Sequence, residues 1–458
     1  MSYHLVMDNT LPIDSADYMQ GSPRPNLPQI GSGINGLANR LSAETLPSFF
    51  FKNDTSQLII LGNGLDLACG LKSRYSDFFN WYFHDFMDEG IGNSPSTQGQ
   101  QVLRKIQESC GGLGSINNGQ HTRLTFDNIE KVHSVWDYVF AYECTRNQPN
   151  EWKDVEAVIR KWVSNSYLQQ IVGSLRNGRV PNVGYDNSGE LGVCLAMVAY
   201  MFSKEYDVNA QIEDSQINEI MLKELSMFED SFASYLESAV SPEYKTRACC
   251  LFDDLAGQDL EHISKVGDSP EHLSNSVLSF NYTQPFPLNQ EHVNVAHKIH
   301  TYRNIHGSLE GGRIIFGIDS LADDGNNLLE NKAVLPFTKT YRIMHNAEPS
   351  IQGLFDTGHI SRRNGDCLDA IKIFGHSLGK ADYSYFQAIF DQENLYSGDV
   401  VLVFYYRPYD GFRVEQYYQA VVNLLSRYAD TLDNPAHGKN LIHKLILEDR
   451  LSVRELEG

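Results

Sequence analysis

Short apolar runs that end in turn residues occur in two separate parts of the chain. The first is Leu58–Leu61, which leads directly into a Gly-Asn-Gly turn. Four more runs follow later in the chain, at 277–280, 313–318, 371–374 and 400–406. Runs of this length that are apolar throughout are typical of strands buried on both faces of a parallel sheet. The pattern therefore predicts one parallel sheet whose first strand is separated from the rest by a long insertion.

Helical spacing of apolar residues dominates the segment between these two parts. It is clearest in 152–162 and 215–240, and no convincing run of strands occurs between about residues 90 and 270. Amphipathic helices are also predicted at 414–428 and 437–447. The helix after Asp382 is predicted to join the last two strands by a right-handed crossover.

These elements predict the fold class and the domain organisation. The fold class is α/β, a Rossmann-like parallel sheet with a large inserted helical subdomain. Residues 1–56, rich in Pro, Gly, Asn and Ser, are predicted to form an irregular N-terminal extension. The nucleotide-binding α/β domain is predicted at 57–89 and 271–458, and the inserted helical subdomain at 90–270.

The charge and cysteine content narrow the classes of partner. The 458 residues carry 37 basic and 58 acidic side chains, a formal net charge of −21. Such a surface repels phosphate backbones, so general nucleic-acid binding and binding to anionic membranes are disfavoured, although backbone N–H groups in a pocket can still hold a small anion. The seven cysteines form no CxxC pair, and neither a secretory signal nor a long apolar run is visible. We therefore expect a reduced, cytoplasmic protein without a membrane anchor.

The turn after the first apolar run is a candidate ligand loop. Gly62, Asn63 and Gly64 follow the strand, and a helix start follows them. Glycines there let the backbone approach a phosphate, and Asp66 is placed to accept hydrogen bonds from ribose hydroxyls. The alternative is a tight strand–helix turn with Asp66 as the N-cap. The full GxGxxG pattern is absent, so this loop alone does not identify a ligand.

Two further loops are predicted at the same edge of the sheet. Asn281 follows the strand at 277–280, and His306 precedes the strand at 313–318. An Asn side chain can orient a water or a ribose, and a His can act as a general base. The alternatives are an Asx turn for Asn281 and a structural loop histidine for His306.

The pentapeptide GHSLG at 375–379 supports two interpretations. It matches the nucleophile elbow of serine hydrolases, with Ser377, Asp410 and His437 available in the required order. Only one clear strand follows Ser377, however, which disfavours that fold. The same residue types suit a loop that contacts phosphate, formed by Gly375, His376 and Ser377. Asp382 is then either a site residue or a helix N-cap.

Taken together, these segments resemble the AbiH abortive-infection family of bacterial phage-defence proteins. The resemblance spans 58–390 and is carried by ILGNGLDLACGL at 60–71, YSDF at 75–78, WKDVE at 152–156, SFNYT at 279–283, IHG at 305–307, IIFGI at 314–318 and FGHSLGKAD at 374–382. The resemblance implies an effector that stops phage multiplication at the expense of the infected cell. Leu65 and Lys72 stand where the family pattern would have Phe and Pro.

The motif order is also distantly similar to sirtuin-like NAD-cleaving defence domains. That similarity implies that Gly62, Gly64 and the Gly375–Ser377 loop hold the NAD phosphates, and that Asn281 and His306 serve the glycosidic bond. Asn63, Asp66, Tyr75, His376 and Asp382 complete the binding residues that we expect from both resemblances. Thr283 stands where those domains carry an Asp, so no role for that Asp transfers.

These inferences lead to one functional hypothesis and two alternatives. The hypothesis is an antiphage effector that binds NAD or a related nucleotide and hydrolyses the nicotinamide–ribose bond, with NAD as substrate and no metal. The WKDVE segment would place Asp154 or Glu156 near the developing cation, unless it is a solvated helix N-terminus. The alternatives are a serine hydrolase and a non-catalytic nucleotide sensor. We expect control by a phage-derived trigger or regulatory partner, and a homo-oligomer.

Overall fold

A computed structural model gives the structure of the protein. It describes residues 54–84, 114–118, 121–125, 132–146, 152–176, 189–203, 214–263, 272–286, 299–319, 330–346, 368–379 and 382–457. The predicted irregular extension at 1–56 lies outside these ranges except for its last three residues, which belong to the first strand.

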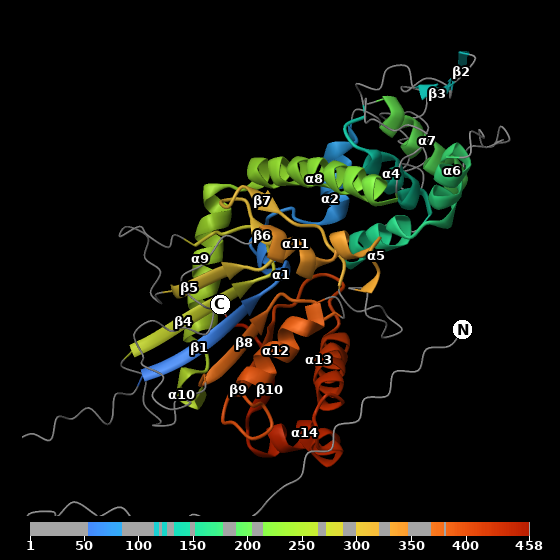
Figure 1. Cartoon of the computed structure of the whole chain (residues 1–458). Helices are drawn as coiled ribbons and strands as arrows, with labels where there is room; N and C mark the ends of the chain where they lie inside the picture. Colours follow the sequence, from blue (N-terminus) through green and yellow to red (C-terminus); the bar gives the residue numbers. More distant parts are fainter. Residues whose placement is uncertain are drawn as a thin grey trace, which may run out of the picture. The chain divides into compact units, whose positions relative to one another are not determined.

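Six parallel strands form the central sheet (Figure 1). β1 (Asp54–Leu61) lies between β4 (His272–Ser279) and β8 (Ala370–Phe374). The remaining strands, β5 (Ile299–Asn304), β9 (Val401–Tyr406) and β10 (Leu451–Glu455), complete the order β10-β9-β8-β1-β4-β5. The predicted α/β class with a parallel sheet is confirmed. The order reverses between β1 and β8, and open sheets of this Rossmann order bind ligands at such a reversal.

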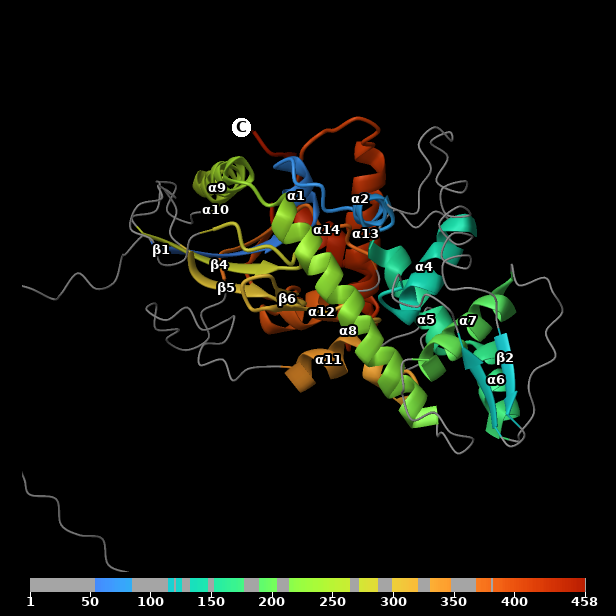
Figure 2. The same cartoon turned by 90° about the horizontal axis from the view of Figure 1, so that it is seen from above.

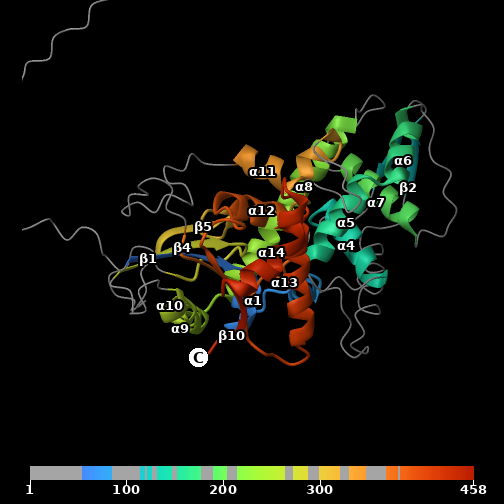
Figure 3. The ribbon, with the colours of Figure 1, turned by 90° about the horizontal axis from the view of Figure 1, so that it is seen from below.

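Helices cover both faces of this sheet, as Figures 2 and 3 show from above and below. Alternate residues of β1 point to opposite faces, so Ile59 and Leu61 pack in one apolar core while Leu58 and Ile60 pack in the other. The first core includes side chains of α1 (Gly64–Ala68), α8 (Asp214–Ala239) and α9 (Pro242–Gly257). The second includes side chains of α12 (Tyr383–Gln392), α13 (Val414–Ala429) and α14 (Pro435–Leu447).

Local sequence signals explain where two of these helices begin. In α9 the Ser241 side chain accepts the amide of Tyr244 and Pro242 occupies the first turn; in α14 Asn434 and Pro435 play the same parts. A hydroxyl or amide oxygen at the N-cap satisfies an amide that has no partner within the helix, and proline suits the first helical position. The predicted helices after Asp382 and at 215–240, 414–428 and 437–447 are confirmed to within a few residues.

The segment between β1 and α8 is largely helical. It contains α2 (Tyr75–Tyr82), α4 (Val135–Arg146), α5 (Trp152–Val163), α6 (Ser166–Arg176) and α7 (Glu190–Ser203). The helix predicted at 152–162 is thus confirmed. The expectation of no strands in this segment was wrong, because β2 (Gly114–Asn118) and β3 (His121–Thr125) pair as an antiparallel hairpin. None of the described helices combines the length and apolar character that crossing a membrane requires.

The strand predicted at 313–318 was largely wrong. Only β7 (Arg313–Ile314) forms, and it pairs antiparallel with β6 (Gly307–Ser308) outside the main sheet. Beyond it the backbone has other partners: the amide of Phe316 donates to the Glu229 side chain, and that of Ile318 to the carbonyl of Phe337. Phe337 is the last residue of a short 3₁₀ helix, Leu335–Phe337, which precedes α11 (Lys339–Asn346).

Two strands of the central sheet and one helix that covers it were missed by the sequence analysis. The run at 400–406 is not the last strand of the chain, because β10 follows it. β10 is the edge strand on one side of the sheet, and β5 is the edge strand on the other. Both edge strands are rich in polar residues, reading IHTYRN and LSVRE. Helix α9 and the short α10 (Leu260–Ile263) fall inside the predicted insertion at 90–270, yet the Gln57 side chain of β1 donates to Ala256 of α9. The predicted domain boundaries stay a prediction.

Candidate functional site

Four loops that are far apart in sequence meet at the carboxyl edge of the sheet. They follow β1 at Gly62–Gly64, β4 at Asn281, β5 at His306 and β8 at Gly375–Ser377. All four strands are parallel neighbours, so their carboxyl ends lie on the same side of the sheet. The loops at residues 62 and 375 flank the reversal in strand order between β1 and β8.

The glycine loops pack directly against each other. A Cβ on Gly62 would lie 2.6 Å from the Gly375 carbonyl oxygen, and one on Gly64 would lie 2.5 Å from the Gly375 Cα. Gly375 itself has φ +72°, a conformation that favours glycine. Larger residues would separate the loops, so the contact between β1 and β8 explains all three glycines.

This packing leaves little of the loop free for a phosphate. The amides of Gly62, Gly64 and Leu65 donate to the carbonyls of Phe374, Gly375 and Gly62, at 3.0, 2.8 and 2.9 Å. A phosphate cradle needs such amides to point at the ligand. In this conformation these three donors are occupied, so the geometry does not support the predicted phosphate contacts of Gly62 and Gly64.

Asp66 occupies the centre of a buried hydrogen-bond network. Its Oδ1 accepts from the Tyr244 hydroxyl at 2.6 Å, the Thr283 hydroxyl at 3.0 Å and Asn281 Nδ2 at 3.3 Å. Burial raises the pKa of Asp66 to about 6, although these hydrogen bonds oppose the rise. The residue is not the helix N-cap, a position that Asn63 holds, and its carboxyl group binds protein side chains rather than facing solvent.

Asn281 is buried and incompletely hydrogen-bonded. The residue is 4% exposed, and its Oδ1 has no hydrogen-bond partner. Its main-chain carbonyl accepts from the Asn304 side chain at 2.7 Å, which fixes the loop. A buried acceptor without a partner costs about 1–3 kcal/mol, so a ligand or water that donates to Oδ1 would bind favourably.

His306 belongs to a second buried group at the same edge. Its Nε2 lies 3.6 Å from Asp382 Oδ1 and has no hydrogen-bond partner. His376 Nε2 lies 3.4 Å from the other carboxyl oxygen of Asp382, and the Phe280 ring contacts both imidazoles. Burial, with the nearby charge of Lys339, lowers the pKa of His306 to about 3, so its imidazole is neutral near pH 7.

Sequence reasoning missed the cation of this group, Lys339. The residue is 5% exposed, and its Nζ lies 2.6 Å from Glu156 and 2.7 Å from Asp382. Burial opposes the charged form, yet the two carboxylates hold the pKa of Lys339 above its ordinary value. The only sequence signals nearby were the WKDVE segment and Gly317, where a Cβ would meet Lys339 Cγ at 2.8 Å.

The two acidic partners of Lys339 resolve two open alternatives. Asp382 occupies the N-cap position of α12 but makes no side-chain cap, because its carboxylate binds Lys339. Burial would raise the pKa of Asp382, but the Lys339 ammonium holds it below its ordinary value. Glu156 is paired within this group rather than solvated, and burial raises its pKa to about 7. The side chain of Asp154 lies outside the described residues.

The two groups do not contact each other through their predicted catalytic side chains. Asn281 is bonded to the network around Asp66, toward α1 and α9. His306 packs toward α12, against Asp382 and Tyr385. Their backbones are nevertheless close, since each lies two residues beyond the paired positions Ser279 and Asn304 of adjacent strands.

The remaining predicted binding residues have other surroundings. Asn63 Oδ1 accepts from the Ser73 hydroxyl at 2.5 Å. Tyr75 is fully buried among aromatic rings, including Phe78 and Phe140, so a ligand contact of Tyr75 is not supported by its position.

The geometry does not support a nucleophile elbow at Ser377. The serine is exposed, and no hydrogen bond joins it to a histidine in the part of the chain that the structure describes. The positive φ values of this turn fall on Gly375 and Leu378 and not on the serine, whereas a strained nucleophile is the mark of the elbow. The ring of His437 stacks on Tyr396, 3.9 Å between centroids. Two strands, not one, follow Ser377, so the strand count no longer argues against the hydrolase fold.

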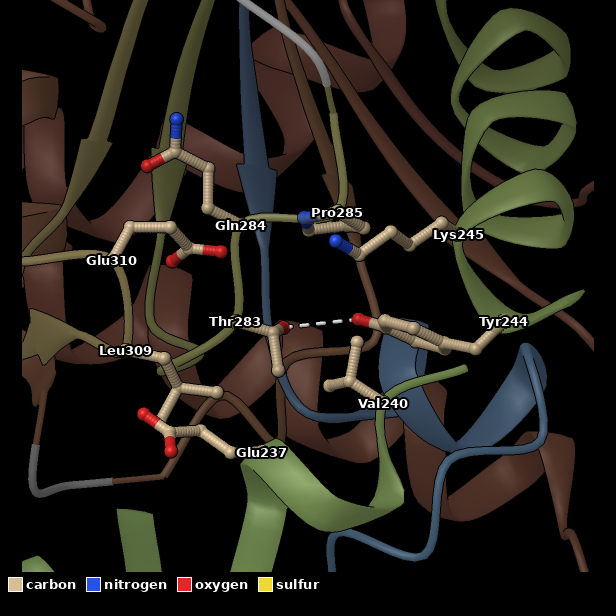
Figure 4. A pocket seen from close by; sticks show the side chains of 9 residues that line it. All are labelled: Glu237, Val240, Tyr244, Lys245, Thr283, Gln284, Pro285, Leu309 and Glu310. Carbon is tan, nitrogen blue, oxygen red and sulfur yellow. Dashed lines mark hydrogen bonds between the residues drawn. The ribbon is translucent and has the colours of Figure 1, made fainter. Parts of the chain in front are cut away.

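A cavity of about 370 Å³ adjoins the Asp66 network (Figure 4). The end of α8 and the start of α9 form one side of it, and the loops after β4 and β6 form the other. Its lining includes Glu237, Tyr244, Lys245, Thr283 and Glu310. No group of three or more His, Cys, Asp or Glu within the described ranges is arranged to hold a metal ion.

The strand order defines an α/β protein with a Rossmann-like parallel sheet, and buried polar groups gather at the carboxyl edge of that sheet. The chain belongs to the family described as bacteriophage abortive infection AbiH, whose sequence model matches residues 58–406. No curated protein and no solved structure matches the chain. The family assignment supports a role in abortive infection by bacteriophage.

Proposed function

We propose that this abortive-infection protein binds NAD, or a closely related nucleotide, at the carboxyl edge of its sheet and hydrolyses the nicotinamide–ribose bond. One observation carries the proposal. Asn281 and His306 follow adjacent strands, and each keeps one buried polar atom without a hydrogen-bond partner. Buried polar atoms are nearly always paired in proteins, so two such atoms at the ligand edge of a sheet favour a ligand that completes them.

The reaction consumes NAD and water and releases nicotinamide, ADP-ribose and a proton. The positively charged nicotinamide leaves readily, so the protein must orient a water and support the cationic ribose. His306 is neutral near pH 7, so its Nε2 accepts a hydrogen bond from the attacking water and takes the water's proton as the new C–O bond forms. Burial and Lys339 oppose the resulting imidazolium, whereas Asp382 at 3.6 Å favours it. Asn281 Oδ1 accepts from a ribose hydroxyl. The two residues follow adjacent strands, which lie ~5 Å apart, but their side chains face α9 and α12, so the substrate must span the carboxyl edge of the sheet to reach both.

The glycine loops act differently in this proposal than the sequence suggested. They bring β1 and β8 together, and the phosphates lie outside the Gly62–Gly64 turn because its amides are occupied. Depletion of a central nucleotide must be restrained before infection. The proposal therefore includes control by a phage-derived trigger, by a regulatory partner or by assembly of several copies, and places the reaction in the cytoplasm.

Nicotinamide release from NAD tests the proposal. Purified full-length protein is incubated with NAD, alone and with extract of phage-infected cells, and free nicotinamide is measured. His306→Ala and Asn281→Ala should each lower the rate at least 100-fold, whereas His437→Ala should retain it. Urea unfolding of each variant shows whether it is folded.

Other outcomes would refute the proposal. NAD binding without turnover under either condition favours a non-catalytic sensor. Loss of activity in Ser377→Ala, with covalent labelling of that serine by a fluorophosphonate, favours a serine hydrolase. Full activity in the double variant Asn281→Ala/His306→Ala would remove both residues from the mechanism.

A further inference from the structure

The cavity in Figure 4 is connected to the proposed catalytic residue Asn281 through a short chain of hydrogen bonds. Tyr244 and Thr283 line the cavity, and their hydroxyls bond to each other at 3.0 Å. Both hydroxyls also bond to Asp66, which in turn accepts from Asn281 Nδ2. A group bound in the cavity is therefore held against side chains that fix the position of Asn281.

The charges of the lining select against a phosphate. Glu237 and Glu310 contribute two carboxyl groups, and Lys245 contributes one ammonium group. Figure 4 shows Glu310 and Lys245 on opposite sides of the cavity, with the hydrogen-bonded Tyr244 and Thr283 hydroxyls below them in the view. Carboxylates accept hydrogen bonds from hydroxyls and attract cations, but they repel phosphate. The net charge of the whole chain, −21, reinforces this preference.

The size of the cavity selects for part of a dinucleotide. Small-molecule sites range over roughly 300–1,000 Å³. At about 370 Å³ this cavity lies at the small end of that range, which suits a nucleoside rather than a complete dinucleotide. The nicotinamide riboside portion of NAD matches the lining in chemistry as well, because it carries one positive charge and two ribose hydroxyls.

We propose that this cavity binds the cationic nicotinamide riboside end of the substrate, while the phosphates remain outside. The inference rests on the function proposed above and adds the part of the ligand that each wall recognises. Glu237 and Glu310 bind the positive charge and the ribose hydroxyls. Tyr244 and Thr283 are positioning residues that contact the ribose and, through Asp66, fix the side chain of Asn281 behind the cavity wall. The site therefore selects the oxidised, cationic nicotinamide over its neutral dihydro form.

Direct binding of fragments tests this assignment. Isothermal titration calorimetry of the full chain is carried out with nicotinamide riboside, its dihydro form and ADP-ribose, each alone. Nicotinamide riboside should bind at least 10-fold more tightly than the dihydro form. The variant Glu237→Gln/Glu310→Gln should lose that preference, with less than a 2-fold change in ADP-ribose affinity. Glu219→Gln, an exposed residue on the same helix as Glu237, is the matched control and should bind as the native chain does.

The outcomes separate this inference from the proposed reaction. Equal binding of the cationic and dihydro forms, or unchanged binding in the double glutamine variant, would overturn the cavity assignment. NAD hydrolysis with an unchanged KM in that variant would overturn the cavity and leave the reaction standing. Selective binding of nicotinamide riboside that the variant loses, without any NAD turnover, would support the cavity and refute the hydrolysis.

Discussion

Replacing Lys339 with Met is expected to destabilise the protein strongly, because the buried ammonium is shared by two carboxylates. The side chain of Lys339 is 5% exposed, and those of Glu156 and Asp382 are 17% and 16% exposed. Removing one partner from a buried ionic group leaves unpaired charge away from water, which costs about 3–5 kcal/mol. We expect Lys339→Met to lower the free energy of unfolding by about that amount at pH 8.

The chain supplies a matched control in Lys161. Its Nζ also bridges two glutamates, Glu143 at 2.8 Å and Glu190 at 2.7 Å, but its side chain is 39% exposed. Water screens such a pair, and the buried Glu143 keeps a second donor in the Trp162 indole. Lys161→Met should therefore lose less than about 1 kcal/mol. The two substitutions make the same chemical change, and the main difference between the two sites is burial.

The effect of Lys339→Met should also depend on pH. Without the ammonium, the pKa values of Glu156 and Asp382 in the folded variant rise above those of the unfolded chain. The folded variant then binds more protons than the unfolded chain, so its stability falls as the pH rises. The deficit relative to the native chain should be larger at pH 8 than at pH 5, measured by urea unfolding. Equal losses for Lys339→Met and Lys161→Met, or a deficit that shrinks with rising pH, would refute the reasoning.

Three further predictions use the same unfolding assay. Gly375→Ala should lower the free energy of unfolding several-fold more than Gly411→Ala. Both glycines have positive φ, a conformation that costs another residue about 1–2 kcal/mol, but only at Gly375 would the added Cβ meet backbone, 2.6 Å from the Leu65 nitrogen. Similar losses of stability in the two variants would contradict the loop contact. Burial raises the pKa of Asp66 from its ordinary value of 3.8 to about 6. The folded state therefore holds that proton more tightly, and stability falls as the pH rises from about 4 to 6. The native chain should lose about 2 kcal/mol more than Asp66→Asn between pH 4 and 7, and parallel pH profiles would contradict this. Lys372→Met should lower the free energy of unfolding by about 3 kcal/mol, because Lys372 Nζ donates to the carbonyls of Leu255, Ala256 and Gln258. The control is Lys444→Met, at a partly exposed lysine on α14. A loss of stability no greater than that of the control would show that these hydrogen bonds contribute little.

Much of the sheet could be predicted because its central strands carry their signal locally. The runs at 58–61 and 400–406 are apolar throughout, and that at 371–374 is apolar except for Lys372, as is typical of interior parallel strands. The edge strands β5 and β10 carry polar residues and were missed for the same reason. A strand was wrongly predicted at 313–318 because an apolar run indicates that its side chains are buried but does not indicate which groups its backbone hydrogen-bonds to. Its backbone bonds to Glu229 and Phe337 instead of to a strand.

The candidate site could be predicted only as far as its loops. The positions of the loops at residues 62, 281 and 375 follow from predicted strand ends and parallel topology. The His306 loop was expected at the same edge only as the segment before 313–318, because the strand that it follows, β5, was not predicted. The side-chain networks depend on elements whose sequence shows no relation to the edge. Lys339 lies at the first position of α11 and Tyr244 in the first turn of α9, and neither belongs to a recognisable motif. Their importance arises from three-dimensional contact with Asp382 and Asp66, which no local pattern reveals.

The placement of β1 between β4 and β8 also has a consequence during synthesis of the chain. The last residues of β1 and β8, Leu61 and Phe374, are 313 positions apart, yet the two strands are neighbours. At translation speeds of ~5–20 residues per second, β1 leaves the ribosome roughly 15–60 s before β8 is complete. The glycine contact and the Lys339–Asp382 pair form later still. Nascent chains and translation products that end before β8 therefore lack an assembled carboxyl edge.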